Sequence, residues 1–191
     1  MNRWRLSKYN PDLRDERGAY TVDEWTAASD IGRDFAGAPL TVQDYLASET
    51  AHVEAIQSFM AELGLDALEL ADLCGPDGLT LEGALTPEVL ASVAGVIREE
   101  QARLLADNAL PVVDFDITAQ DDPRRLSGEA LEAALRLCLR EVLWANLAAP
   151  GALEITFGYD YLLSVSAAAP CPEAQRRTHA LGLFLEPSPA R

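Results

Sequence analysis

The sequence pattern that most constrains the fold runs from residue 153 to residue 166, where apolar and polar side chains alternate. Because successive side chains of a strand point to opposite faces of its sheet, we expect one buried face and one solvent-facing face. Helices can then cover only one side, which predicts a two-layer α+β fold. The even-numbered positions are mostly polar or glycine, whereas the odd-numbered positions are apolar or aromatic: Leu153, Ile155, Phe157, Tyr159, Tyr161, Leu163 and Val165.

Three other segments space their apolar residues as amphipathic helices do. The first follows Thr41, which can cap a helix, and ends at Gly64. The second follows Thr86, and the third follows Ser127 and continues to Trp144. Each segment is long enough to cover strands, and so we expect three long helices, mainly on one face of the sheet.

Shorter alternating or apolar runs predict the remaining strands. The 191 residues suit a single domain, residues 1–191, and a doubly wound α/β sheet is the alternative fold. Residues 10–40 are rich in Pro, Gly, Asp and Arg and predict a long ordered loop, and residues 75–78 predict a turn. We expect about five strands in a mixed or antiparallel sheet, at residues 3–9, 66–73, 112–117, 153–166 and 181–186.

The chain is strongly acidic, with 31 Asp and Glu against 15 Lys and Arg and a formal net charge of -16. Residues 41–120 concentrate this excess, because they hold 15 acidic residues against only Arg98 and Arg103. Binding to nucleic acid or to an anionic membrane is disfavoured, since both rest on positive side chains. A basic protein partner is favoured, because an acidic surface speeds encounter with a basic one. The alternative is that the charge only keeps the chain soluble.

The sequence also bears on compartment and cofactors. The N-terminus has early charges but no apolar run after them, and no segment is long and apolar enough to span a bilayer. The cysteines Cys74, Cys138 and Cys171 are far apart and form no CxxC pair. We therefore expect a cytoplasmic protein without a disulfide or a structural zinc site. Because no phosphate-binding glycine loop, HExxH motif or nucleophile elbow occurs, we expect no cofactor. The oligomeric state is not predicted.

The N-terminal loop is dense in aromatic and charged residues, which often contact protein partners. Its candidate partner-binding residues are Tyr20, Glu24, Trp25 and Asp30. The alternative is a loop that packs on itself, with its charges paired internally and its tryptophan in the core.

Glu49 lies on the apolar stripe of the first predicted helix and is therefore a candidate buried charge. A carboxylate in this position must be paired or have a raised pKa, which is one route to a general base close to His52. The alternative is a structural ion pair with an arginine of the N-terminal loop, such as Arg14 or Arg17. We favour the ion pair, because structural pairs also bury carboxylates.

Asp114 and Asp116 share one face of the predicted strand 112–117, and Asp160 lies on the polar face of residues 153–166. Carboxylates two residues apart on a strand point the same way and can share a divalent cation. The alternative is a solvated or partner-binding face. We expect no metal and treat the three aspartates as partner-binding candidates.

Several short motifs resemble a known family, mostly towards the two ends of the chain. They read Lys8-Tyr9-Asn10-Pro11, Arg14-Asp15, Gly18, Tyr20, Asp23-Glu24-Trp25-Thr26, Ser29-Asp30-Ile31-Gly32, Leu139-Arg140-Glu141 with Trp144, Phe157-Gly158-Tyr159-Asp160-Tyr161 and Gly182-Leu183-Phe184-Leu185-Glu186. These motifs resemble a family of small bacterial conserved hypothetical proteins. The family is similar in size and acidity to toxin-neutralising immunity proteins, and the resemblance implies no catalytic residue.

These observations lead to one functional hypothesis and two alternatives. The hypothesis is a non-catalytic acidic interaction protein, of the immunity or inhibitor type, that neutralises a basic protein partner. The first alternative is a metal-assisted hydrolase that uses the clustered carboxylates, or Glu49 as a base. The second is an acidic mimic of nucleic acid that occupies a DNA-binding protein.

Overall fold

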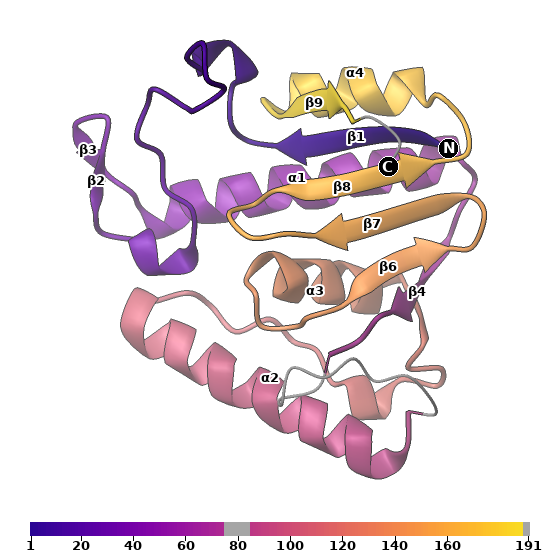
Figure 1. Ribbon diagram of the computed structural model, residues 1–191. Coiled ribbons are helices and arrows are strands. Elements are labelled where there is room, and N and C mark those ends of the chain that lie inside the picture. The colour runs from indigo at the N-terminus through magenta and orange to yellow at the C-terminus, as the bar shows by residue number, and fades with distance from the viewer. Residues whose placement is uncertain (75–84, 189–191) are drawn as a thin grey trace.

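A computed structural model describes residues 1–74 and 85–188 of the chain. Its centre is a seven-stranded sheet in the order β5-β4-β6-β7-β8-β1-β9 (Figure 1). Every pair of neighbouring strands runs antiparallel, so the α+β prediction is confirmed and the doubly wound alternative is wrong. The strands are β1 (Asn2–Ser7), β4 (Ala67–Ala71), β5 (Arg125–Ser127), β6 (Asn146–Ala149), β7 (Leu153–Phe157), β8 (Leu163–Ala167) and β9 (Phe184–Pro187).

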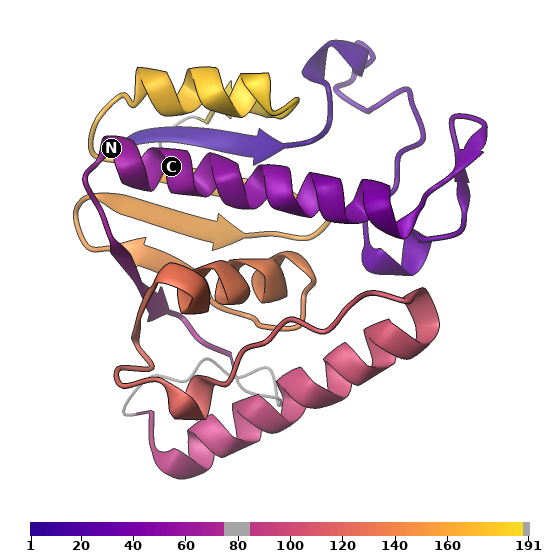
Figure 2. The ribbon, with the colours of Figure 1, turned by 180° about the vertical axis from the view of Figure 1, so that it is seen from behind.

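Helices cover one face of this sheet. Figure 2 shows α1 (Val42–Glu62) and α3 (Gly128–Leu139) crossing that face, and α4 (Pro172–Ala180) packs against α1. α2 (Pro87–Asn108) lies beside the sheet instead and packs on short 3-10 helices (Figure 1). The prediction of about five strands and three helices was therefore too low, since the described residues form a seven-stranded sheet and four α-helices.

The segment predicted as a loop, residues 10–40, holds only short elements, and the turn predicted at residues 75–78 lies outside the described residues. Within residues 10–40, an isolated antiparallel bridge joins Arg14 to Tyr20. The short elements of the segment are η1 (Pro11–Leu13), η2 (Ala28–Asp30), β2 (Asp34–Phe35) and β3 (Ala38–Pro39).

The first two helices begin where the sequence predicts them, because their caps form. The Thr41 hydroxyl accepts a hydrogen bond from the Asp44 backbone N–H at 3.1 Å, and the Asp44 carboxylate accepts one from the Thr41 N–H at 3.4 Å. The Thr86 hydroxyl caps α2 in a similar way. The third helix is shorter than predicted: it ends at Leu139, and Glu141 then has a left-handed backbone (φ 58°) that an α-helix cannot contain.

The pattern at residues 153–166 belongs to two strands rather than to the single strand predicted. β7 and β8 form a hairpin in which Ile155 pairs with Val165 and Phe157 with Leu163. Directly opposed residues share a face of the sheet, and here odd-numbered residues oppose odd-numbered residues. The alternation of β7 therefore resumes in the same phase in β8, although Tyr159 in the turn is exposed, and one strand and one hairpin give the same sequence pattern.

Residues 112–117 were predicted as a strand, but they are an extended segment that leads into η3 (Ile117–Ala119). Its backbone bonds to a side chain of α2: the Gln101 amide donates to the Val113 carbonyl at 3.1 Å and accepts from the Val113 N–H at 2.5 Å. Val113 and Phe115 pack against the core, and Ile117 is buried in it. The alternation of buried and exposed side chains over residues 112–117 is therefore confirmed. However, the backbone of this segment bonds to the side chain of Gln101 and not to a neighbouring strand.

Candidate interaction site

Segments that carry the short motifs converge at one end of the sheet, around a buried aromatic cluster. Trp25 of the N-terminal loop contacts Tyr45 of α1 at 5.3 Å between ring centroids and Tyr161 of the β7–β8 turn at 5.2 Å. His52 of α1 meets Tyr161 edge-on at 5.1 Å. Tyr161 has a left-handed backbone (φ 57°), which is rare for an aromatic residue, and these three rings hold it in place.

Lys8 is the cation at the centre of the N-terminal loop. Its ammonium group lies 4.1 Å from the centroid of Tyr9 and 4.2 Å from that of Trp25, and it pairs with Glu24 at 3.0 Å. Burial lowers the pKa of Lys8, while Glu24 opposes the shift. Two aromatic faces and one carboxylate thus surround a single cation.

The other N-terminal candidates also make contacts within the chain. Tyr20 packs on Tyr9, with 5.3 Å between ring centroids, and remains partly exposed. Asp30 accepts hydrogen bonds from the backbone N–H groups of Thr26 at 2.8 Å and Ala27 at 3.3 Å, and it pairs with Arg33. Although burial opposes the shift, these donors lower the pKa of Asp30. The N-terminal loop is therefore ordered by contacts within the chain, and its Trp25 packs against Tyr45 of α1.

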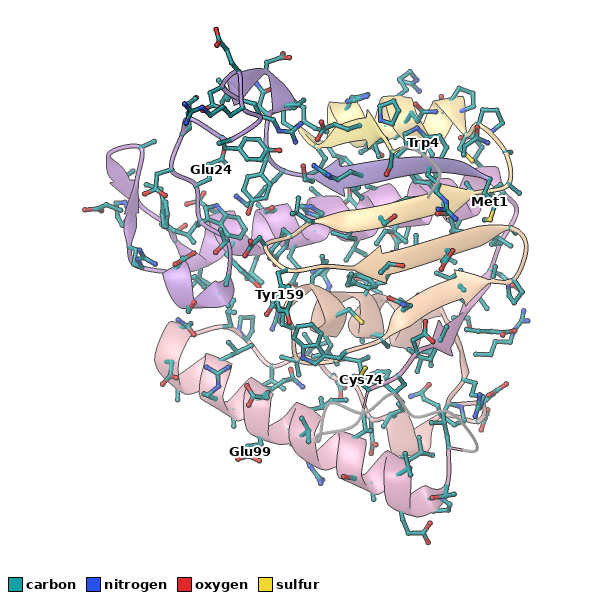
Figure 3. All side chains as sticks on the ribbon, viewed as in Figure 1. Met1, Trp4, Glu24, Cys74, Glu99 and Tyr159 are labelled. Carbon is teal, nitrogen blue, oxygen red and sulfur yellow. The ribbon has the colours of Figure 1, made fainter. Side chains whose placement is uncertain are left out.

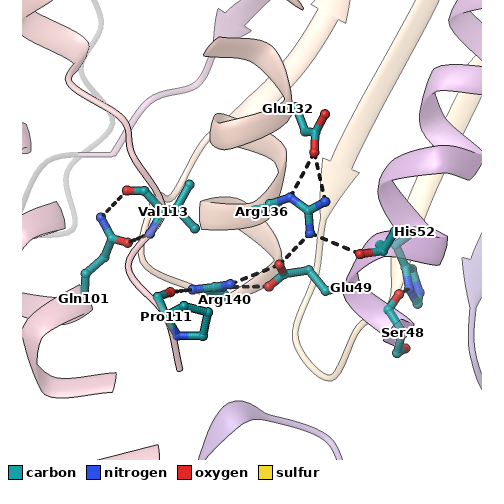
Figure 4. A network of polar contacts seen from close by, with 10 residues as sticks. Ser48, Glu49, His52, Gln101, Pro111, Val113, Glu132, Arg136 and Arg140 are labelled. Atoms are coloured by element: carbon teal, nitrogen blue, oxygen red, sulfur yellow. Dashed lines mark hydrogen bonds and ion pairs between the residues drawn. The ribbon is translucent and has the colours of Figure 1, made fainter. Parts of the chain in front are cut away.

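Glu49 is fully buried between α1 and α3, and its predicted partners Arg14 and Arg17 are wrong (Figure 4). Arg140, which directly follows α3, binds it twice, through Nε at 2.6 Å and Nη2 at 3.0 Å, and Arg136 of α3 adds a third contact at 2.9 Å. Arg136 and Arg140 are one helical turn apart, so both face α1. With its oxygens held by two guanidinium groups and its side chain enclosed, Glu49 is a structural ion-pair partner.

Four buried polar atoms make no hydrogen bond of ordinary geometry among the described residues, although the Tyr45 and Tyr161 hydroxyls interact with each other. They lie in the aromatic cluster or next to it: the Tyr45 and Tyr161 hydroxyls, the Ser48 hydroxyl and His52 Nε2. His52 donates from Nδ1 to the Ser48 carbonyl at 2.7 Å, which leaves Nε2 as the unprotonated nitrogen. Burial lowers the pKa of His52 to about 4. The interior therefore holds a neutral imidazole.

A second group of charged and aromatic residues, which we name the corner, consists of Glu141, Trp144, Tyr159 and Asp160. It forms where the end of α3 meets the β7–β8 turn; Figure 3 labels Tyr159 there. The Trp144 and Tyr159 rings lie 5.5 Å apart, with 41% and 66% of these residues exposed. Burial and the nearby charge of Asp160 raise the pKa of Glu141. The two carboxylates are thus close enough to repel each other, and the charge of Lys8 also acts on Asp160.

Asp114 and Asp116 lie far along the chain from the corner, on the extended segment after α2. Both are exposed, and Asp116 accepts hydrogen bonds from the Thr118 N–H and hydroxyl at 2.9 and 2.6 Å, which lower its pKa. Among the residues that the structure describes, no three His, Cys, Asp or Glu side chains are placed to hold a metal ion together. Asp160 therefore does not join Asp114 and Asp116 in one metal site.

The surface of α2 and of the segment that follows it gathers exposed carboxylates. Figure 3 shows Glu99 pointing away from the rest of the protein. Two apolar side chains, Leu105 and Val112, are also about half exposed here, at 48% and 57%. We name this region the α2 acidic surface and define it by its exposed acidic residues: Glu88, Glu99, Asp107, Asp114 and Asp116.

Sequence reasoning found part of this arrangement. It named Asp160 but not Glu141, Trp144 or Tyr159 as site candidates, although the motifs Leu139-Arg140-Glu141 and Phe157-Gly158-Tyr159-Asp160-Tyr161 contain them or lie next to them. No periodicity in the sequence shows that the end of α3 meets the β7–β8 turn. The motifs were the only available signal.

No protein-family model matches this chain, and no curated protein or solved structure is significantly similar to it. The resemblance to small bacterial hypothetical proteins therefore stays a prediction. None of the helices in the described part of the chain is long and apolar enough to cross a membrane. The functional argument accordingly rests on the residues of the site itself.

Proposed function

We propose that this chain is a non-catalytic acidic interaction protein of the cytoplasm that neutralises a basic protein partner, as an immunity or inhibitor protein does. The observation that carries the proposal is the α2 acidic surface. Its carboxylates exceed the nearby cations, since Arg98 and Arg103 are the only basic residues between residues 41 and 120. Such an excess attracts a basic surface over about 8–10 Å at ordinary ionic strength.

Of the five carboxylates of this surface, only Asp107 makes an ion pair with a described basic side chain. Arg103 pairs with Glu100 at 2.7 Å and lies 3.9 Å from Asp107. Glu88, Glu99 and Asp114 make no ion pair with another described side chain. They therefore remain available to the lysines and arginines of another protein, and such contacts give specificity and fast association.

The same surface supplies apolar area. Leu105 of α2 and Val112 of the following segment are exposed on the same two elements that carry the carboxylates. Protein interfaces commonly combine an apolar centre with a charged rim, and the centre supplies most of the binding free energy. The α2 acidic surface fits this pattern better than it fits a face that only maintains solubility.

The arrangement gives the hydrolase alternative no support. Glu49 is enclosed and bound by two arginines, so no substrate can reach its carboxylate. Asp114 and Asp116 do not meet Asp160 in a group of ligands. The acidic mimic of nucleic acid differs from the main proposal only in its partner, which would be a DNA-binding protein.

A pull-down with matched charge variants tests the proposal. The bait is the tagged protein in a lysate of its native cells, and the test variant carries Glu88→Gln, Glu99→Gln and Asp114→Asn. The control variant carries Glu54→Gln, Glu69→Gln and Glu154→Gln, which change the net charge equally at exposed positions elsewhere.

We expect one basic protein to be retained by the wild type and the control at low salt, released at high salt and lost from the test variant. Retention by all three proteins, or equal loss from both variants, would contradict the proposal. A retained DNA-binding protein that DNA displaces would favour the mimic.

A further inference from the structure

The helices leave one face of the sheet open, and the strand register fixes which residues lie on it. Figure 1 shows the sheet from this open side, with α1 and α3 behind it. Directly opposed residues of antiparallel neighbours share a face. Trp4 and Val165 oppose each other in the core, so the residues on either side of them in their strands point to the open side. One row of opposed residues crosses this face from β5 to β1: Arg125, Glu69, Ala148, Glu154, Ser166 and Arg3.

The charges on the open face balance, although those of the whole chain do not. Every charged residue of the seven strands lies on this face, because each belongs to the row above or to the next row on the same face, which contains Arg5 and Glu186. Three arginines thus accompany three glutamates, whereas the whole chain carries a formal net charge of -16. Two copies of the chain can therefore approach each other through the open face without the repulsion that their acidic surfaces would cause.

Arg3 and Glu154 flank Ser166 of β8, one on each side. They are two strands apart, or about 10 Å, and both are exposed. Neither makes an ion pair with another described side chain. β8 itself contributes only the short side chains of Ser164 and Ser166 to this face. The centre of the face is therefore formed by short side chains, between a cation and an anion that can pair with another molecule.

We propose that the open face binds a second copy of this chain, about a two-fold axis that runs along β8. Half a turn about this axis exchanges the positions of β1 and β7 and leaves each residue at its height along the strands. Arg3 of either copy then lies over Glu154 of the other, so the same ion pair forms twice. Serines meet at the axis, which permits the usual separation of packed sheets, about 10 Å, and an arginine and a glutamate together can span it.

The charges favour this axis over the neighbouring ones. An axis along β7 would place Glu154 over Glu154 of the second copy, and an axis along β1 would oppose Arg3 and Arg5 to themselves. The five strands centred on β8 measure about 24 Å across and five residues of a strand about 17 Å, which gives roughly 400 Å² per copy. Because standard interfaces bury about 800 Å² per partner, we expect a weak dimer.

Sedimentation equilibrium of the full-length protein tests the inference, at about 150 mM salt and at protein concentrations from about 10 to about 500 µM. We expect the average mass to rise from that of a monomer towards that of a dimer within this range. A wild type that stays monomeric at the highest concentration would overturn the inference.

Charge reversals locate the interface. Arg3→Glu or Glu154→Arg alone brings like charges together, and each should weaken the dimer at least tenfold without lowering the melting temperature. The double variant Arg3→Glu/Glu154→Arg exchanges the two charges and should restore the dissociation constant to within about threefold of the wild type. An equimolar mixture of the two single variants should also associate, because every facing pair is then opposite in charge.

The matched control is Glu54→Arg on α1, which changes the net charge as Glu154→Arg does but lies on the side that the helices cover. This control should not weaken the dimer. Single reversals that associate as the wild type does, a double variant that stays monomeric, or equal weakening by Glu54→Arg would each contradict the proposed dimer.

The dimer and the proposed function are tested independently, because α2 lies beside the sheet and not on its open face (Figure 1). Loss of the dimer through Glu154→Arg should leave capture of the basic partner intact. The Glu88→Gln/Glu99→Gln/Asp114→Asn protein should in turn lose the partner and keep the dimer. A wild type that dimerises as expected but captures no basic protein would support this inference and remove the proposed function.

Discussion

Glu49 of α1 and Arg140, the C-terminal cap of α3, form an ion pair that is closed to solvent, with Arg140 Nε 2.6 Å and Nη2 3.0 Å from the two carboxylate oxygens of Glu49. Arg140 also donates to the Pro111 carbonyl at 2.7 Å. One guanidinium group thus joins both helices that cover the sheet to the segment that follows α2.

Removing one partner of this pair should destabilise the fold strongly. Glu49→Ala leaves Arg140 buried without a counter-charge, and we expect the free energy of unfolding to fall by about 3–5 kcal/mol. The matched control is Glu54→Ala on the exposed side of α1, which should change it by less than about 0.5 kcal/mol. Chemical denaturation measures both changes, and equal stability of the two variants would show that the pair contributes little.

The buried histidine should make stability depend on pH. Burial lowers the pKa of His52 to about 4, below its value in the unfolded chain. Below about pH 6.5 the unfolded chain takes up a proton that the folded protein refuses, and so stability falls as the pH falls towards 4. Between pH 7 and pH 5 this group should remove roughly 2 kcal/mol.

Denaturant titrations at both pH values test this effect. In His52→Phe the loss between pH 7 and pH 5 should shrink by that amount, whereas the exposed control His179→Gln should behave as the wild type does. An unchanged pH dependence in His52→Phe would mean that another group carries it.

The buried Tyr161 hydroxyl interacts with the Tyr45 hydroxyl but makes no hydrogen bond of ordinary geometry, which is costly. Tyr161→Phe should therefore raise the free energy of unfolding by about 1 kcal/mol. In contrast, the Tyr9 hydroxyl donates to the Trp25 carbonyl at 3.3 Å, and Tyr9→Phe should lower it by about 1 kcal/mol. Thermal and chemical melts of the two variants provide the comparison, and a clear loss in Tyr161→Phe would reveal a polar partner for this hydroxyl.

Asp160 should contribute little to stability, because its charge is repelled by that of Glu141 and attracted only at longer range by that of Lys8. Asp160→Asn removes the repulsion and keeps a residue that tolerates the left-handed backbone, so stability at pH 7 should stay equal or rise by a few tenths of a kcal/mol. Asp30→Asn is the contrasting variant: it weakens a carboxylate that accepts two backbone N–H groups and should lose about 1 kcal/mol or more. A loss above about 1 kcal/mol in Asp160→Asn would assign Asp160 a structural role.

Features that depend on neighbouring residues were predictable from the sequence. The caps at Thr41 and Thr86 act within one helical turn, and both helices begin there. The apolar stripe that placed Glu49 in the interior is equally local. α4 was missed because its buried residues are only Ala174 and Thr178, which give no apolar stripe. β6 was missed because four residues are too short for a pattern.

Features that depend on tertiary packing were not predictable. The partners of Glu49 are 87 and 91 residues away, on a helix whose direction only the packed structure defines. The corner likewise needs the end of α3 beside the β7–β8 turn. The strand predicted at residues 112–117 was wrong for a related reason. The backbone of this segment bonds to the Gln101 side chain, where a strand would bond to a neighbouring strand.

The most direct test of the central claim is the affinity of the captured basic partner for the purified protein at about 50 and 300 mM salt, measured by calorimetry. The proposed function predicts an affinity at least tenfold weaker at the higher salt. It also predicts that the Glu88→Gln/Glu99→Gln/Asp114→Asn protein binds weakly at both salt concentrations while its melting temperature is unchanged. An affinity that neither salt nor these substitutions alter would contradict the claim that the α2 acidic surface binds the partner.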